Sequence, residues 1–171
     1  MAKNYLDIIK TQREEKKKEK FEGTFLEYLS LVEKDPTLTD HAHKRLYDSI
    51  AEEGISRMDD SDPRKHKLFD GDNIKTYDYF QSEFFGMESV ISKLMRFLRS
   101  AALKGEESRQ VLLLMGPVGA GKSALTEHIK SALDGKPYYH LKNDPQRGEP
   151  LQLVPRSLRN KFNDMLDVNI E

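Results

Sequence analysis

Residues 111–123 read VLLLMGPVGAGKS, and this stretch decides the fold class that we expect. Residues 111–115 form an unbroken apolar run of the kind found in buried strands of parallel sheets. They lead directly into residues 116–123, which match the pattern G-x-x-x-x-G-K-[ST] at every fixed position. Because glycine has no Cβ, the glycines here allow a tight turn whose backbone N–H groups can approach an anion. The sequence therefore predicts a phosphate-binding P-loop, the Walker A motif.

The residues behind the loop predict an α-helix that contributes to the same site. Between residues 123 and 133 the apolar side chains fall at 125, 129, 132 and 133, on one helical face, and Asp134-Gly135 would end the helix. The helix N-terminus would direct its partial positive charge at bound phosphates. Lys122 is expected to reach the β- and γ-phosphate oxygens, and the Ser123 hydroxyl to complete the coordination of Mg²⁺.

These patterns define a candidate nucleotide site. Its predicted cofactor-binding residues are Gly116, Pro117, Val118, Gly119, Ala120, Gly121, Lys122 and Ser123, and Ser123 is the predicted metal ligand. The alternative is a glycine-rich turn that matches the pattern by chance. Strand, loop and helix occur in the order that a P-loop requires, which favours the nucleotide site.

Length and composition limit the class of protein. The 171 residues suffice for one domain with a core and a smaller appendage. Lys and Arg number 28 against 29 Asp and Glu, so the net charge of -1 gives no reason to expect nucleic acid or an anionic membrane as a partner. The absence of cysteine excludes disulfides and thiolate chemistry. No apolar stretch approaches the roughly 18 residues of a membrane span, and the N-terminus lacks the apolar core of a signal peptide. We expect a cytoplasmic protein.

Residues 1–55 are predicted to form a small helical N-terminal region. Residues 4–20 are expected to be a charged, solvated helical arm, since the lysines at 16–18 are interleaved with glutamates; a basic patch for nucleic acid or protein is the alternative. Thr24 and Glu27 have the spacing of a capping box at the start of the next helix. A further helix is predicted from about residue 40 to 53. His41 and His43 point to different faces of it, so we do not expect them to bind a metal.

The polar residues 56–76 are interpreted as a linker, and residues 77–171 as the first part of the nucleotide domain. An aromatic segment, residues 77–87, precedes a strongly amphipathic helix that covers residues 90–102. An aromatic-glycine step ahead of a P-loop resembles the adenine-side element of AAA+ ATPases, and this resemblance implies that Phe85 and Gly86 lie beside the base. Ordinary core packing is the alternative role for Phe84 and Met87.

Beyond the P-loop helix, residues 136–142 are predicted to form a second strand, and βαβ connectivity then implies a parallel sheet. A last helix is predicted from Leu158, Phe162 and Met165, with Pro155 near its start. No apolar strand ending in Asp or Asp-Glu follows Lys122, although a P-loop ATPase needs one to hold Mg²⁺. We therefore expect the N-terminal part of a longer protein, with a sheet that is incomplete at the C-terminus and with unknown catalytic residues.

Five groups of motifs follow one another along the chain: Glu22-Gly23-Thr24-Phe25 with Tyr28-Leu29, Ala42-His43 with Arg45 and Tyr47, Phe84-Phe85-Gly86, residues 116–123, and Pro150-Leu151 with Leu153-Val154-Pro155. In this order they resemble the N-terminal part of PrkA-type serine protein kinases of bacteria. The similarity spans nearly the whole chain. One departure is Gly119-Ala120-Gly121, where the family more often has a serine with glycines.

The resemblance implies an α/β fold: an AAA-like P-loop module with a parallel sheet, preceded by the helical region. It also implies ATP with Mg²⁺ as cofactors, phosphorylation of serine in protein substrates, a stress or sporulation setting, and possible homo-oligomers of the full-length protein. A P-loop holds phosphates for hydrolysis as readily as for transfer to a hydroxyl. The kinase activity therefore rests on the resemblance alone. The alternatives are a AAA+ ATPase machine that remodels or delivers protein substrates, and a non-enzymatic role in which residues 1–75 recruit partners.

Overall fold

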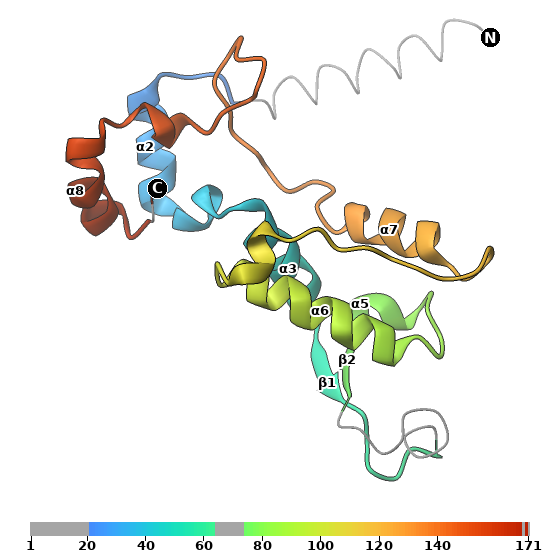
Figure 1. Cartoon of the computed structure of the whole chain (residues 1–171). Helices are drawn as coiled ribbons and strands as arrows, with labels where there is room; N and C mark the ends of the chain where they lie inside the picture. Colours follow the sequence, from blue (N-terminus) through green and yellow to red (C-terminus); the bar gives the residue numbers. More distant parts are fainter. Residues whose placement is uncertain (1–20, 64–73, 169, 171) are drawn as a thin grey trace, which may run out of the picture. The chain divides into compact units, whose positions relative to one another are not determined.

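The computed structural model describes residues 21–63, 74–168 and 170, and these form two compact units (Figure 1). One unit joins the described residues up to Pro36 with those from Tyr139 onwards, and the other comprises residues 37–138. The charged arm predicted for residues 4–20 and the middle of the predicted linker lie outside the described residues. The helix predicted to start at the capping box and the helix predicted from about residue 40 to 53 both form, but they belong to different units.

The unit of residues 37–138 is built around one long helix, α6 (Glu88–Ala102). The other elements include α3 (Ala42–Ala51), β1 (Ile55–Arg57), β2 (Lys75–Tyr77), α5 (Asp78–Gln81), a 3-10 helix (Glu106–Arg109) and α7 (Lys122–Ser131). The buried residues of α6 recur every three or four positions and include Ile91, Leu94, Met95 and Leu98. They form one core with Ile50 of α3, Phe80 of α5 and Leu125 of α7. The amphipathic helix predicted for residues 90–102 is thus confirmed.

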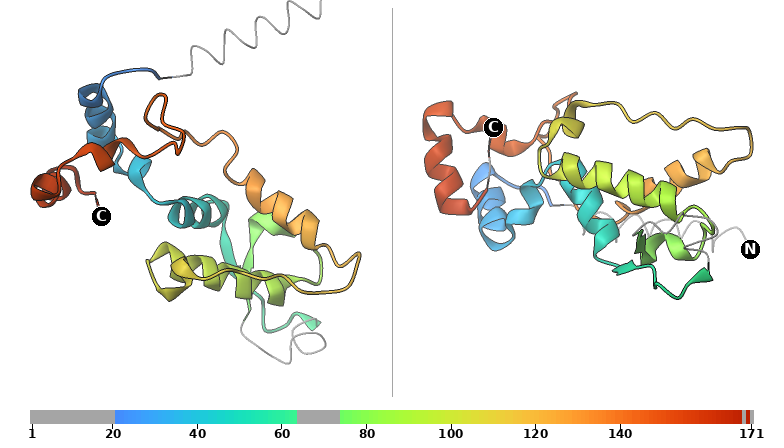
Figure 2. Two further views of the ribbon diagram at one scale, coloured as in Figure 1. Left: turned by 45° about the horizontal axis from the view of Figure 1, so that its top comes forward. Right: turned by 60° about the horizontal axis from the view of Figure 1, so that its bottom comes forward.

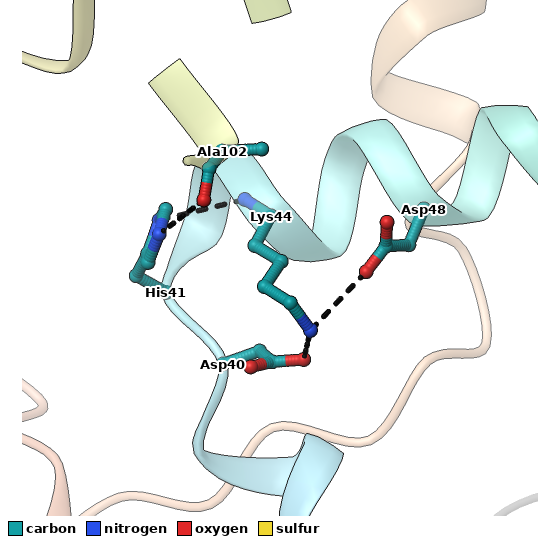
Figure 3. Close-up of polar contacts among 5 residues, drawn as sticks. All are labelled: Asp40, His41, Lys44, Asp48 and Ala102. Atoms are coloured by element: carbon teal, nitrogen blue, oxygen red, sulfur yellow. Dashed lines mark hydrogen bonds and ion pairs between the residues drawn. The ribbon is translucent and has the colours of Figure 1, made fainter. Parts of the chain in front are cut away.

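A histidine joins the start of α3 to the end of α6 (Figure 3). His41 is the N-cap of α3, and its Nδ1 accepts a hydrogen bond from the Lys44 N–H at 3.4 Å. Because Nδ1 accepts, Nε2 carries the proton and donates to the Ala102 carbonyl oxygen at 3.1 Å. The Lys44 ammonium pairs with both Asp40 and Asp48, whose carboxylates raise its pKa. His41 therefore has a structural role, as the N-cap of α3 and as a link to the end of α6.

The two ends of the predicted linker pair with each other. β1 and β2 form an antiparallel pair in which Ile55 lies opposite Tyr77 and Arg57 opposite Lys75. Just beyond the pair, Met58 and Ile74 form a small buried cluster, and the Met58 N–H donates to the Ile74 carbonyl at 3.1 Å. The described ends of the linker are thus part of this unit. Strands of three residues are too short to produce a recognisable sequence period.

The parallel sheet predicted for this chain does not form, and this is a correction to the expected fold. Residues 111–115 have no strand structure, and Val111 and Met115 are 93% and 83% exposed. Figures 1 and 2 show this stretch as an extended trace that runs along α6 before it enters α7. Residues 136–142 form no strand either. A strand needs neighbours that satisfy its backbone groups, and β1 and β2 make up the sheet within the described residues.

The other unit contains α2 (Phe25–Lys34), a 3-10 helix (Pro150–Leu153) and α8 (Arg156–Leu166). Its core consists of Tyr28 and Val32 of α2 with Leu151 and Val154. The predicted capping box is present: the Glu27 N–H donates to the Thr24 hydroxyl at 3.4 Å, and the Thr24 N–H donates to the Glu27 carboxylate at 2.6 Å. The predicted C-terminal helix is also present, with Pro155 as its N-cap.

Candidate functional site

The predicted P-loop is a turn that ends at the first residue of α7. Gly119 and Gly121 have φ values of 81° and 76°, in the left-handed region where a side chain is strained. Gly121 is the N-cap of α7, and Lys122 is the first helical residue. The Ala120 N–H closes the turn by donating to the Pro117 carbonyl at 3.3 Å. The two glycines therefore adopt the left-handed backbone conformation that a tight P-loop turn requires. The predicted helix begins directly after Gly121.

Lys122 folds back over the loop. Its ammonium group donates to the carbonyl oxygens of Gly116 at 2.7 Å and Pro117 at 2.6 Å. An ammonium has three donors, and both of these partners are neutral. Phosphate oxygens are charged acceptors and would bind the same ammonium more strongly. The loop thus holds its cation directly above the turn in which phosphate is predicted to bind.

Ser123 lies in the first turn of α7, and its side chain is exposed. A hydroxyl at this position suits a Mg²⁺ ion that keeps several waters and takes few ligands from the protein. Among the residues that the structure describes, no group of three or more His, Asp or Glu side chains is arranged to hold a metal. The chain's predicted contribution to a metal is therefore the Ser123 hydroxyl.

The aromatic segment reaches the P-loop through Met87. A Cβ built on Gly121 would stand 3.8 Å from the Met87 Sδ, which is an ordinary van der Waals contact. Gly86, with a φ of 73°, turns the chain just before Met87. Phe84 is buried in the core, as the core-packing alternative predicts, whereas the ring of Phe85 is 77% exposed. The structure thus brings this segment beside the loop and leaves the Phe85 ring uncovered.

Phe85 also lines a hollow of about 360 Å³ beside the β1–β2 pair. Phe80, Phe84 and Glu88 share its wall, and burial raises the pKa of the Tyr77 hydroxyl there. No residue of the predicted P-loop belongs to that wall. The hollow is therefore not the phosphate site.

His128 is the residue of this region that the sequence analysis missed. It lies on α7, where its Nε2 faces the Tyr79 carbonyl oxygen at 2.9 Å and its Nδ1 faces the Glu83 carboxylate at 3.1 Å. The Tyr79 hydroxyl donates in return to the His128 carbonyl oxygen at 2.5 Å. The available signal was position: His128 falls three residues after Leu125, on the buried face of the helix.

Comparisons with known proteins define the class to which this loop and helix belong. The model of the PrkA AAA domain matches residues 23–171. AAA domains are P-loop NTPase modules that bind ATP, usually with Mg²⁺. The chain belongs to the PrkA AAA domain family.

Relatives of this chain include an ATP-dependent protease PrkA of Bacillus subtilis, which is 32% identical over 97% of this chain and 26% of the relative. The serine/threonine kinase YeaG of Escherichia coli K12 is 35% identical over 94% of this chain and 24% of the relative. A mitochondrial Lon protease homolog of Yarrowia lipolytica is 34% identical over 36% of this chain and 5% of the relative. The chain thus spans about a quarter of the length of its PrkA and YeaG relatives. No solved structure matches it.

No helix among the described residues is long and apolar enough to cross a membrane.

Proposed function

We propose that residues 116–123 bind the phosphates of ATP with Mg²⁺, and that the chain is the nucleotide-binding part of an ATP-dependent enzyme acting on proteins. The observation that carries this proposal is the loop itself. Two left-handed glycines lead into the N-terminus of α7, and the Lys122 ammonium lies over the turn. Such a turn offers N–H groups, a helix end and a cation to the same anion.

The residues of the loop have separate roles in this proposal. Lys122 exchanges its two carbonyl partners for β- and γ-phosphate oxygens when nucleotide binds, and Ser123 is the protein ligand of Mg²⁺. The backbone from Gly116 to Gly121, including Pro117, Val118, Gly119 and Ala120, surrounds the phosphates. Phe85 and Gly86 lie beside the base. Mg²⁺ neutralises phosphate charge when it is bound.

The first candidate for the reaction is transfer of the γ-phosphoryl group to serine hydroxyls of protein substrates, with ADP as the other product. Support comes from the Escherichia coli relative, which is named a serine/threonine kinase and aligns with nearly all of this chain. The groups of the P-loop suit this reaction because phosphoryl transfer depends on positioning and on charge neutralisation.

The second candidate is hydrolysis of ATP that drives the remodelling, delivery or degradation of a protein. Support comes from the Bacillus subtilis PrkA and the Lon homolog, which are both named as proteases. In this case water replaces the serine hydroxyl as the nucleophile, and homo-oligomers of the full-length protein are expected.

One labelling experiment tests the site and separates the candidates. The protein is incubated with γ-labelled ATP, Mg²⁺ and cell extract, and the label is followed into phosphoserine and into free phosphate. Label in protein serine supports the kinase. Release of free phosphate without labelled protein supports the ATP-driven machine.

The Lys122→Ala variant is the control for the site. It should weaken ATP binding by about 1.5–3 kcal/mol, since it removes charge-assisted hydrogen bonds to phosphate. An unchanged ATP affinity in this variant would show that the phosphates are held elsewhere. A purified protein that binds no ATP at all would refute the proposal.

A further inference from the structure

A compact set of polar contacts joins α7 to the aromatic segment. We call it the His128 junction; its members are Tyr79, Glu83, His128 and Ser131. The His128 ring contacts the Tyr79 carbonyl and the Glu83 carboxylate, while the Tyr79 hydroxyl contacts the His128 carbonyl and, at 2.9 Å, the Ser131 hydroxyl. The ring also packs on three aromatic rings, with centroid distances of 4.4 Å to Tyr79, 5.6 Å to Phe80 and 5.3 Å to Phe84.

The two nitrogens of His128 have different partners. A backbone carbonyl can only accept, so Nε2 must be a donor toward Tyr79. The Glu83 carboxylate accepts from Nδ1 when the ring carries both protons, and the contact is then an ion pair. The His128 side chain is 15% exposed and Glu83 is 60% exposed, so Glu83 can turn to water whereas the ring cannot. The hydrogen bond from the His128 ring to the Tyr79 carbonyl is therefore the contact of the junction that water cannot replace.

The junction and the predicted phosphate ligands lie on the same continuous helix, α7. Lys122 and Ser123 lie in its first turn, and His128 lies in the following turns of the same helix. On the other side, the aromatic segment continues from Glu83 through Phe85 and Gly86 to Met87, whose sulfur lies 3.8 Å from the position that a Cβ on Gly121 would take. The segment that is proposed to lie beside the base thus bonds to α7 at His128 and lies near the N-terminus of the same helix.

We propose that His128 is a positioning residue for nucleotide binding. It fixes α7 against the aromatic segment, so that the groups for the phosphates and the groups for the base meet one ligand in a single geometry. This inference rests on the proposed function of the P-loop. A ligand that contacts both parts gains from the fixed geometry, while a ligand that contacts the loop alone does not.

Two ligands therefore distinguish positioning from general damage. ATP would contact both parts, and tripolyphosphate would contact the P-loop alone. We would measure the dissociation constants of both with Mg²⁺ by calorimetry, for the protein and for His128→Ala. Loss of a hydrogen-bonded positioning group is expected to weaken ATP binding about tenfold. Tripolyphosphate binding should change by less than about twofold, since Lys122 and the loop remain.

Conservative variants provide the rescue test. His128→Gln keeps an N–H that can donate to the Tyr79 carbonyl, so it should recover most of the ATP affinity. Glu83→Gln removes only the exposed partner of the ring and should have a small effect. His140→Gln is the matched histidine control, because the His140 ring contacts the neighbouring Leu141 carbonyl and lies outside the unit of α7. It should bind both ligands as the unaltered protein does.

The outcomes separate the two proposals. If His128→Ala binds ATP normally, or if it weakens ATP and tripolyphosphate by the same factor, the positioning role is wrong and the phosphate site stands. If His128→Ala does not fold, His128→Asn takes its place, because its side chain is polar but too short to reach the Tyr79 carbonyl, and it is judged by the same ratio of the two affinities. If the unaltered protein binds neither ligand, or if Lys122→Ala binds both normally, the proposed function fails and the positioning role fails with it.

Discussion

The Met87 sulfur lies 3.8 Å from the point where a Cβ on Gly121 would stand. The end of the aromatic segment therefore lies close to the last glycine of the predicted P-loop. Gly121 has a left-handed φ of 76°, and it is also the N-cap of α7. Gly121 therefore combines three roles: it forms part of the turn, it caps α7, and its missing side chain leaves room beside Met87.

Gly121→Ala is expected to destabilise the protein by about 1–2 kcal/mol, because an L-residue is strained in the left-handed region. The added Cβ itself would only touch Met87 at an ordinary distance, so backbone strain accounts for the loss. Denaturant unfolding measures it. Gly135→Ala is the matched control: Gly135 has a φ of 77° with open space around it, so it should show a similar loss of stability. Gly121→Ala alone should also lose ATP affinity. If Gly121→Ala were as stable as the unaltered protein, the left-handed conformation observed at Gly121 would be wrong.

Several features of the fold could be predicted because their signals are local. Thr24 and Glu27 are three residues apart and form the capping box that their spacing indicates. The apolar period of α6 places Leu94 and Leu98 in the core. The glycine pattern of the P-loop likewise predicts left-handed residues immediately before a helix, and Gly119 and Gly121 have that conformation.

The features that could not be predicted depend on partners far away in the sequence. The apolar residues 111–115 indicate a strand, but a strand forms only where other strands pair with it, and a local pattern cannot supply them. The position of His128 indicates a buried side chain, but it cannot identify the partner Tyr79, which lies 49 residues earlier in the chain. The pairing of Ile55 with Tyr77 was missed because each strand has three residues, too few for a period.

His41 offers a test of the contact between α3 and α6. His41→Ala loses both the N-cap of α3 and the hydrogen bond to Ala102, and it should destabilise the protein by about 1–2 kcal/mol. His41→Asn keeps an oxygen that can cap the helix but is too short to reach Ala102, so about half of that loss is expected. Thermal unfolding of both variants checks this order. Equal losses in the two variants would mean that the cap contributes nothing.

The aromatic segment contains a matched pair of phenylalanines. Phe80 is 1% exposed and belongs to the core around α6, whereas Phe85 is 77% exposed. Phe80→Ala should cost about 3–5 kcal/mol of unfolding free energy, since it removes a buried ring and leaves a cavity. Phe85→Ala should change stability by less than about 0.5 kcal/mol. Denaturant unfolding compares them, and a large loss in Phe85→Ala would show that its ring is buried.

Glu149 is expected to make stability fall as the pH rises. Burial raises the pKa of its carboxyl group above the ordinary value of 4.5, so the folded protein holds this proton more tightly than the unfolded chain does. The stabilisation is complete below about pH 4.5, and it is lost as the pH rises through the folded value. Glu149→Gln keeps a neutral side chain at every pH. The variant should therefore gain stability relative to the unaltered protein between pH 4 and 7, and a constant difference across this range would contradict the prediction.

Asp144 should make the stability of the protein depend on pH in the opposite direction. Its carboxylate accepts hydrogen bonds from the Gly148 N–H at 2.6 Å and the Gln146 N–H at 3.1 Å, and these donors lower its pKa from the ordinary value of 3.8. Its stabilisation is present above about pH 3.8 and disappears as the pH falls through the folded value. Asp144→Asn replaces one acceptor oxygen with a donor, so one of the two N–H groups loses its partner.

Faster hydrogen exchange at Gly148 or Gln146 is therefore expected in Asp144→Asn at neutral pH. The difference in stability from the unaltered protein should shrink toward acid pH, where the native carboxylate is itself protonated. Asp134→Asn, a change of the same type at an exposed aspartate, serves as the control and should leave both amides unchanged. If exchange at both amides were the same in Asp144→Asn as in the unaltered protein, these hydrogen bonds would not hold the loop. The two N–H groups would then be protected by other parts of the unit.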